Sequence, residues 1–217
     1  MSAPFPFQVL DSPAALASCP WWTEEVYCDL LAFQAGRISA AALDAKYVHR
    51  KAILTLDLTG FTDHCMHHHP AHAFLRILDA QKICVPVLQE HGASLIRAFA
   101  DDLVGLFDDP GSALEAAFEM HRRVAAFNAS ELCGAHPAEC CIGVGFGDVY
   151  AIGTNRAMGD EMNRAAKLGE EIARGGETLV TSNLHEALRH RADLVFEQQQ
   201  SDDQLFPYLR ASPARQA

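Results

Sequence analysis

The sequence predicts an α+β domain with a ferredoxin-like βαββαβ core, additional C-terminal strands and a helix, and an N-terminal helical extension. Two patterns lead to this fold class. β-rich runs alternate with helical periodicity in that order, and one pair of β-rich runs has the short polar connection of a hairpin. With 217 residues, 49 % of them hydrophobic, the chain can form one full core plus an extension. We expect an extension over residues 1–47, a main domain over 48–212 and a tail over 213–217.

The N-terminal extension carries two helical patterns. Residues 1–20 are rich in Pro, Ser and Ala and are expected to be irregular, whereas Trp21 to Gln34 has apolar residues at helical spacing. Ser39 is placed to cap a second short helix that ends at Tyr47. Acidic residues on the first helix would be repelled by anionic lipid, so we expect this segment to pack on protein rather than on a membrane surface.

The first half of the core begins with a β-rich run and a long helical run. The helical run carries apolar side chains at regular spacing and ends at Gly92. In order, we expect a strand over 51–58, a turn over 59–62, a helix over 71–91, strands over 93–99 and 103–107 joined by a tight turn at 100–102, and a helix from its cap Ser112 to about Asn128. The two joined strands form a hairpin with acidic residues at its tip.

The second half of the core contains shorter runs. In order, we expect strands over 140–146 and 149–152 that meet at Gly147-Asp148, a loop over 153–157, a helix over 159–173, a strand over 177–181, a helix from its cap Ser182 to about His190, and two final strands over 193–199 and 204–210. The sheet is expected to be antiparallel, with helices covering one face.

Charge and cysteine content exclude several classes of protein. The formal net charge is −11, so no chain-wide basic field would attract a nucleic acid polymer or an anionic membrane. The seven cysteines are odd in number and have no zinc-site spacing, which indicates reduced thiols. Residues 1–10 lack a signal-peptide pattern, and no apolar run approaches the ~18 residues of a membrane span. We therefore expect a cytoplasmic protein without membrane insertion.

Two acidic residues lie where strands end. Asp57 closes the first β-rich run and Asp101 lies at the tip of the predicted hairpin. In a ferredoxin-like core these strands can lie side by side, which would bring the two carboxylates together. Carboxylate oxygens suit Mg²⁺ or Mn²⁺, and two such ions could also bind the oxygens of a triphosphate. The turn Thr59-Gly60-Phe61-Thr62 follows directly, and its backbone N–H groups are well placed to hold phosphate.

Three motifs resemble those of the class III nucleotidyl cyclases. Leu56-Asp-Leu-Thr-Gly-Phe-Thr62 resembles the first metal motif of that family, and residues 92–107 resemble its second metal hairpin. Met158-Gly-Asp-Glu-Met-Asn-Arg-Ala-Ala-Lys-Leu168 resembles the helix that supplies transition-state residues, and residues 175–181 resemble the strand that follows. The motifs occur in the family's order across about residues 51–182, so the resemblance implies the class III nucleotide cyclase fold.

The resemblance also implies an active site at the interface of a head-to-tail homodimer. Asp57 and Asp101 would bind two Mg²⁺ or Mn²⁺ ions, assisted by the Leu58 carbonyl. Asn163 of the other subunit would orient the ribose, and Lys167 would contact the phosphates in the transition state. That position is more often Arg in the family; Lys keeps the charge but loses the bidentate fork. The implied reaction is that of a phosphorus–oxygen lyase, which converts a nucleoside triphosphate to its 3′,5′-cyclic monophosphate and pyrophosphate.

Two arginines stand at positions that correspond to the family's base-selecting residues. Arg97 lies four residues before Asp101, and Arg156 lies three residues before the glycine of the third motif. Arginine has only donors and cannot accept a hydrogen bond from the adenine amino group. The two residues therefore favour an acceptor-rich base such as guanine or uracil, or contact phosphate. ATP remains the leading substrate on family frequency, with GTP or a pyrimidine triphosphate as alternatives.

Other interpretations of the same residues stay open. The chain could be a cyclase-homology module that binds nucleotide and acts as a regulatory dimer with little turnover, or, less favoured, a phosphohydrolase that uses the same metals. The histidines from His64 to His72 could form a metal site, because His68 and His72 are spaced i, i+4, or they could form a polar loop that enters the next helix.

Overall fold

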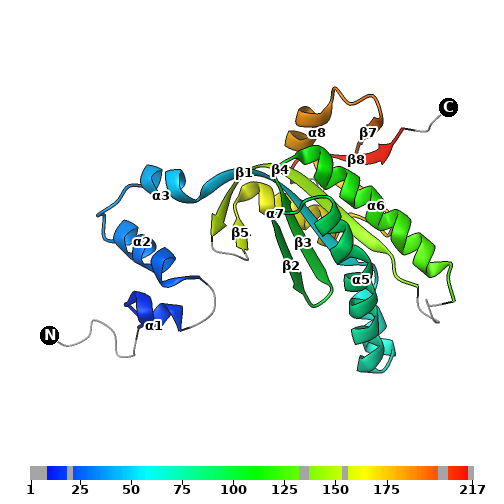
Figure 1. Ribbon diagram of the computed structural model, residues 1–217, viewed down its shortest axis with the longest axis horizontal. Coiled ribbons are helices and arrows are strands. Elements are labelled where there is room, and N and C mark those ends of the chain that lie inside the picture. The colour runs from blue at the N-terminus through cyan, green and yellow to red at the C-terminus, as the bar shows by residue number, and fades with distance from the viewer. Residues whose placement is uncertain (1–8, 19–21, 132–136, 153–155, 200–204, 215–217) are drawn as a thin grey trace. The chain divides into compact units, whose positions relative to one another are not determined.

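The computed structural model describes residues 9–18, 22–131, 137–152, 156–199 and 205–214 (Figure 1). The chain forms two compact units. The first comprises Met1–His49 and Tyr150–Met158, and the second comprises Arg50–Val149 and Gly159–Ala217. In the part of the chain that the structure describes, no helix is both long and apolar enough to cross a membrane.

The first unit contains the two predicted N-terminal helices, α2 (Glu24–Gln34) and α3 (Ala40–Tyr47). It also contains the short helix α1 (Pro13–Ala17), so the prediction that residues 1–20 are irregular is wrong over this segment. The predicted cap is confirmed, because the Ser39 side chain accepts a hydrogen bond from the Ala42 N–H. Buried Val26, Leu43, Tyr47 and Ile152 form a small core. The predicted loop over 153–157 is wrong at its end, because β5 (Arg156–Met158) pairs with Tyr150–Ile152; residues 153–155 lie outside the described residues.

The sheet has the strand order β2-β3-β1-β4-β6-β8-β7, with β5 pairing on β4. Its strands are β1 (Val48–Leu58), β2 (Leu95–Phe99), β3 (Asp102–Phe107), β4 (Cys140–Ile152), β6 (Thr178–Thr181), β7 (Leu194–Gln198) and β8 (Tyr208–Pro213). The order β2-β3-β1-β4 is that of a ferredoxin-like core, so the predicted fold class is confirmed. The sheet is mixed rather than antiparallel, because β4 and β6 run parallel.

Strand β4 is longer than predicted. Residues 140–152 form a single strand, whereas the sequence predicted a break at Gly147-Asp148. Gly147 serves helix packing instead of a turn, since a Cβ there would lie 3.1 Å from the Cγ of Glu161. A glycine in a strand can mark such a close approach as well as a turn.

The second unit contains more helix than predicted. Its helices are α4 (Phe61–His67), α5 (Pro70–Glu90), α6 (Pro110–Asn128), α7 (Asp160–Lys167) with the π-helix η1 (Leu168–Ile172), and α8 (Ser182–Leu188). The predicted turn ends early, because Phe61 already belongs to α4, and residues 64–67 are helical rather than a loop. The predicted helix caps Ser112 and Ser182 are wrong. Asp109 caps α6 and Thr181 caps α8.

Helices cover both faces of the sheet, so the prediction of one covered face is wrong. Helices α5 and α6 lie side by side on one face (Figure 1), where Leu54 and Leu56 of β1 enter the main core. The opposite face receives α7, because the Thr55 hydroxyl donates to the Ala165 carbonyl at 2.8 Å. Gly143 permits this approach, since a Cβ there would lie 2.1 Å from the same carbonyl oxygen. Side chains alternate along a strand, so Asp57 shares the α7 face with Thr55.

Candidate metal centre

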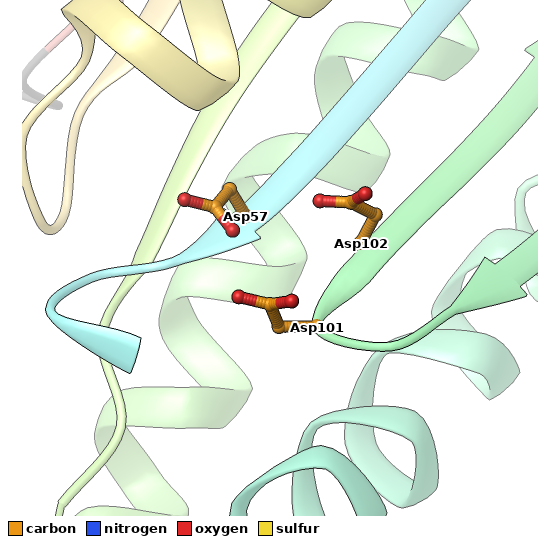
Figure 2. Close-up of side chains that lie close together, drawn as sticks. All are labelled: Asp57, Asp101 and Asp102. Carbon is orange, nitrogen blue, oxygen red and sulfur yellow. The ribbon is translucent and has the colours of Figure 1, made fainter. Parts of the chain in front are cut away.

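Three carboxylates converge where β1 ends and the β2–β3 hairpin turns. Asp57 is the penultimate residue of β1, Asp101 lies in the hairpin turn, and Asp102 begins β3. One oxygen from each lies within 4.8 Å of the others, and Figure 2 shows the three side chains pointing into a common space. The structure thus brings together Asp57 and Asp101, as the sequence predicted, and adds Asp102.

Strand register explains why Asp102 joins the group. Leu56 pairs with Leu103 across β1 and β3, so the next pair outward sets Asp57 opposite Asp102 on one face of the sheet. The turn itself is only Ala100-Asp101, because Phe99 pairs with Asp102. The sequence prediction assigned Asp102 to the turn. If a two-residue turn had been predicted, Asp102 would have been placed in β3 beside Asp57. The local composition does not distinguish a two-residue from a three-residue connection.

The carboxylates of the group repel one another. Burial, followed by the negative charge of Asp101, raises the pKa of Asp57 to about 7. Burial and Asp101 also raise the pKa of Asp102, while the positive charge of Arg97 lowers it. Hard oxygen ligands that repel one another at neutral pH fit a divalent ion such as Mg²⁺ or Mn²⁺, which would neutralise them.

Arg97 and one further acid lie beside the three aspartates. Burial and then the charge of Asp102 raise the pKa of Glu170, which lies in η1, and Arg97 lowers it. Arg97 therefore faces two carboxyl groups and offsets part of their repulsion. Glu170 comes near the aspartates because its neighbour Gly169 lets η1 approach β1 closely; a Cβ on Gly169 would lie 2.8 Å from the Thr55 hydroxyl. The sequence did not indicate this approach, because the two segments are far apart in the chain.

The turn after β1 is only partly available to a ligand. The Thr59 N–H donates to the Glu139 carbonyl at 2.9 Å, and the Thr59 carbonyl accepts from Arg76 at 3.1 Å. Gly60 has φ of 63° and forms the N-cap of α4 without a side-chain cap. Phe61 and Thr62 open the helix, so their backbone N–H groups lie at its uncapped end.

Helix α7 carries Asn163 and Lys167. Asn163 is exposed, and Lys167 forms an ion pair with Glu171 one turn later. Among the described residues, no hydrogen bond or ion pair joins either side chain to Asp57 or Asp101. The structure therefore does not bring these two predicted residues into the acidic group within one chain.

Glu161 anchors α7, and the sequence did not single it out. Its buried carboxylate accepts from the Phe146 N–H and the Asn183 amide, each at 2.9 Å, and from the Thr181 hydroxyl. It packs against Gly145, where a Cβ would come within 3.0 Å of it. These bonds tie the helix to β4 and to the end of β6.

Two other predicted residues have a defined place in the backbone. Leu58 ends β1, and its side chain is buried in the main core. Arg156 begins β5 in the first unit, and its side chain lies outside the described residues.

Comparison with solved structures identifies the fold. The guanylyl cyclase Cya2 matches at 22 % identity with a TM-score of 0.62, covering 76 % of this chain and 91 % of that one. The adenylyl cyclase CyaB from P. aeruginosa matches at 13 % identity with a TM-score of 0.64, covering 78 % and 97 %. The guanylyl cyclase domain of the RhoGC fusion protein from Blastocladiella emersonii matches at 11 % identity with a TM-score of 0.65, covering 78 % and 99 %.

Sequence comparisons add nothing to this result, since no family model and no curated protein matches the chain. At these identities the structural likeness defines the fold alone. The chain has the α+β fold of the class III adenylyl and guanylyl cyclase catalytic domains, as the motifs implied.

Proposed function

We propose that this chain is a class III nucleotidyl cyclase, a phosphorus–oxygen lyase that forms a 3′,5′-cyclic nucleotide and pyrophosphate from a nucleoside triphosphate. The observation that carries the proposal is the convergence of Asp57 and Asp101, with Asp102 beside them, in a chain with a cyclase fold. A carboxylate group with a raised pKa in such a place favours a functional site over a turn former.

Asp57 and Asp101, with the Leu58 carbonyl, would hold two Mg²⁺ or Mn²⁺ ions per active site. Bound there, the ions would supply charge neutralisation for the leaving pyrophosphate and activation of the attacking ribose 3′-hydroxyl. Asp102 adds a third carboxylate at the same place, and its negative charge would strengthen the attraction for a divalent ion. In the predicted turn over Thr59, Gly60, Phe61 and Thr62, the last three would hold the triphosphate through their backbone N–H groups, whereas the Thr59 N–H already donates to the Glu139 carbonyl.

The remaining catalytic groups are proposed to come from a second copy of the chain. Asn163 would orient the ribose, and Lys167 would contact the phosphates in the transition state. Lys167 would exchange its ion pair with Glu171 for the phosphate, which its flexible stem allows. A head-to-tail homodimer with two sites follows from this arrangement.

The choice of base is proposed to depend on Arg156 more than on Arg97. Arg97 lies near Asp102 and Glu170, and its positive charge lowers the pKa of both. This favours contact with phosphate or support of the aspartates over direct reading of the base. Arg156 keeps the base-contact role. We retain ATP as the leading substrate, with GTP or a pyrimidine triphosphate as the alternatives, and a cytoplasmic location with the cyclase domain at 48–212.

Chromatography of the products tests the proposal. Purified protein would be incubated with ATP, GTP, CTP and UTP, each with Mg²⁺ and with Mn²⁺. We expect one cyclic nucleotide to form in the presence of metal and its formation to be lost in Asp57→Ala. Nucleotide binding without a cyclic product would instead identify a regulatory module, and release of a linear product would identify a phosphohydrolase.

A further inference from the structure

Arg76 is a buried cation without a carboxylate partner. It lies on α5, and only 9 % of its surface is exposed. No ion pair involves it among the described residues, although the chain has 28 acidic residues and a net charge of −11. Burying a guanidinium is unfavourable unless its charge and its donors are satisfied. An unpaired one therefore indicates that an anion from outside the chain completes the site.

The position of the guanidinium indicates where that anion would bind. Its Nη2 donates to the Thr59 carbonyl at 3.1 Å, which places it at the turn between β1 and α4. Its Nε is buried without a hydrogen-bond partner. Its Nη1 has no partner in the described part of the chain and is not among the buried atoms, so it remains accessible to a ligand. Asp57 lies two residues before Thr59 in the chain.

The surroundings favour a phosphate group over other anions. The planar guanidinium of an arginine presents donors that match the oxygens of a phosphate group. The neighbouring aspartates would repel a bare anion, but they would accept one that arrives with divalent ions.

We propose that Arg76 is a polyphosphate-binding residue that contacts the phosphate chain of the nucleoside triphosphate. The inference rests on the proposed function for the identity of the nucleotide, and it adds a cation supplied by the same chain that holds the metals. Arg76 would donate from Nη1 to phosphate oxygens while Nη2 keeps its bond to the Thr59 carbonyl.

Binding of inorganic tripolyphosphate tests the proposal apart from catalysis. Wild type, Arg76→Met and Arg76→Lys would be titrated with tripolyphosphate in Mg²⁺ buffer by calorimetry, with Arg122→Met as the control for loss of one positive charge. Arg122 is exposed on α6 and pairs with Glu119. We expect Arg76→Met to bind about 10- to 100-fold more weakly. Arg76→Lys should fall between it and wild type, and Arg122→Met should match wild type.

A folded Arg76→Met variant with wild-type affinity for tripolyphosphate would overturn the proposal. Nuclear magnetic resonance of the wild type covers the case in which that variant does not fold. The Nε–H signal of Arg76, identified by its absence in Arg76→Lys, should shift when tripolyphosphate is added. A signal that stays in place at saturating tripolyphosphate would show that Arg76 only supports the turn.

The outcomes separate this inference from the proposed function. Tripolyphosphate binding that depends on Arg76, without any cyclic product, would keep the inference and reject the cyclase. A cyclic product formed by Arg76→Met with an unchanged KM would keep the cyclase and reject the inference about Arg76.

Discussion

At the scale of single residues, the position of Asp57 has opposite consequences for stability and for function. Its carboxyl group is half-buried beside Asp101 and Asp102, and its pKa is raised to about 7. The unfolded chain loses this proton near pH 4 and the folded chain near pH 7, so folding stability falls as the pH rises through that window. A bound divalent ion would neutralise the ionised carboxylates and so remove this loss of folding stability.

We predict that Asp57→Asn stabilises the metal-free protein above pH 7 by ~1–2 kcal/mol, after allowance for solvent screening. Thermal melting in chelator between pH 5 and pH 8 measures this. The wild type should lose stability as the pH rises, and Asp57→Asn should lose less of it. Glu186→Gln, which removes an exposed carboxylate on α8, should follow the wild type. A variant less stable than wild type at pH 8 would show that the three carboxylates do not repel one another.

Ala100 has a backbone conformation that favours glycine. It lies in the two-residue turn of the hairpin with φ of 51°, where a Cβ is strained. We predict that Ala100→Gly stabilises the protein by ~0.5–1 kcal/mol in chemical denaturation. The matched variant Ala98→Gly lies within β2 and should instead destabilise it by a similar amount. Equal losses in both variants would mean that the turn is not strained.

At the scale of elements, the docking of α7 depends on one buried side chain. Glu161 accepts hydrogen bonds from β4, from Thr181 and from Asn183, and glycines in β4 leave room for it. We predict that Glu161→Ala lowers the free energy of unfolding by ~2–3 kcal/mol, because buried donors lose their acceptor. Cyclase activity should fall as well, since Asn163 and Lys167 lie on this helix. Urea denaturation and product formation measure the two effects.

Asp160→Ala provides the control for this variant. Asp160 precedes Glu161 on the same helix, is exposed, and pairs with Arg164. Its loss should change stability by less than ~1 kcal/mol. If Asp160→Ala and Glu161→Ala had similar effects, the anchoring role of Glu161 would be rejected.

Local sequence signals predicted part of the fold and of the site, and contacts between distant segments account for the rest. Periodicity located most helices and strands, and the hairpin placed Asp101 correctly, because these signals are local. Asp102 was missed because its role depends on the register between β1 and β3. The second covered face was missed because Gly143 and Gly169 serve a close approach between segments far apart in the chain. Arg76 and Glu161 were missed for the same reason, since their partners are distant in sequence.

At the scale of the whole molecule, the proposed site needs two chains. Asp57 lies in the acidic group, whereas Lys167 has no bond to that group within the described part of one chain. Asp57→Ala and Lys167→Ala should therefore each be inactive alone. When they are mixed and allowed to exchange subunits, half of the dimers contain one of each, and each of these has one intact site. We predict recovery of about a quarter of wild-type activity.

Unmixed samples of each variant at the same total concentration provide the control for this experiment. A mixture that remains inactive after subunit exchange, which gel filtration of a tagged partner can verify, would mean that both residues act within one chain. An unmixed Lys167→Ala sample with wild-type activity would mean that Lys167 has no catalytic role.

The most direct test of the central claim measures both products of one reaction. Wild type and Asp101→Asn would be incubated with the preferred triphosphate and Mn²⁺, and cyclic nucleotide and pyrophosphate would be quantified together. A metal-dependent cyclase gives the two in equal amounts, and Asp101→Asn should lower both at least ~100-fold. Formation of neither product by the wild type, or of both at the wild-type rate by Asp101→Asn, would contradict the assignment of the three aspartates to a catalytic metal site.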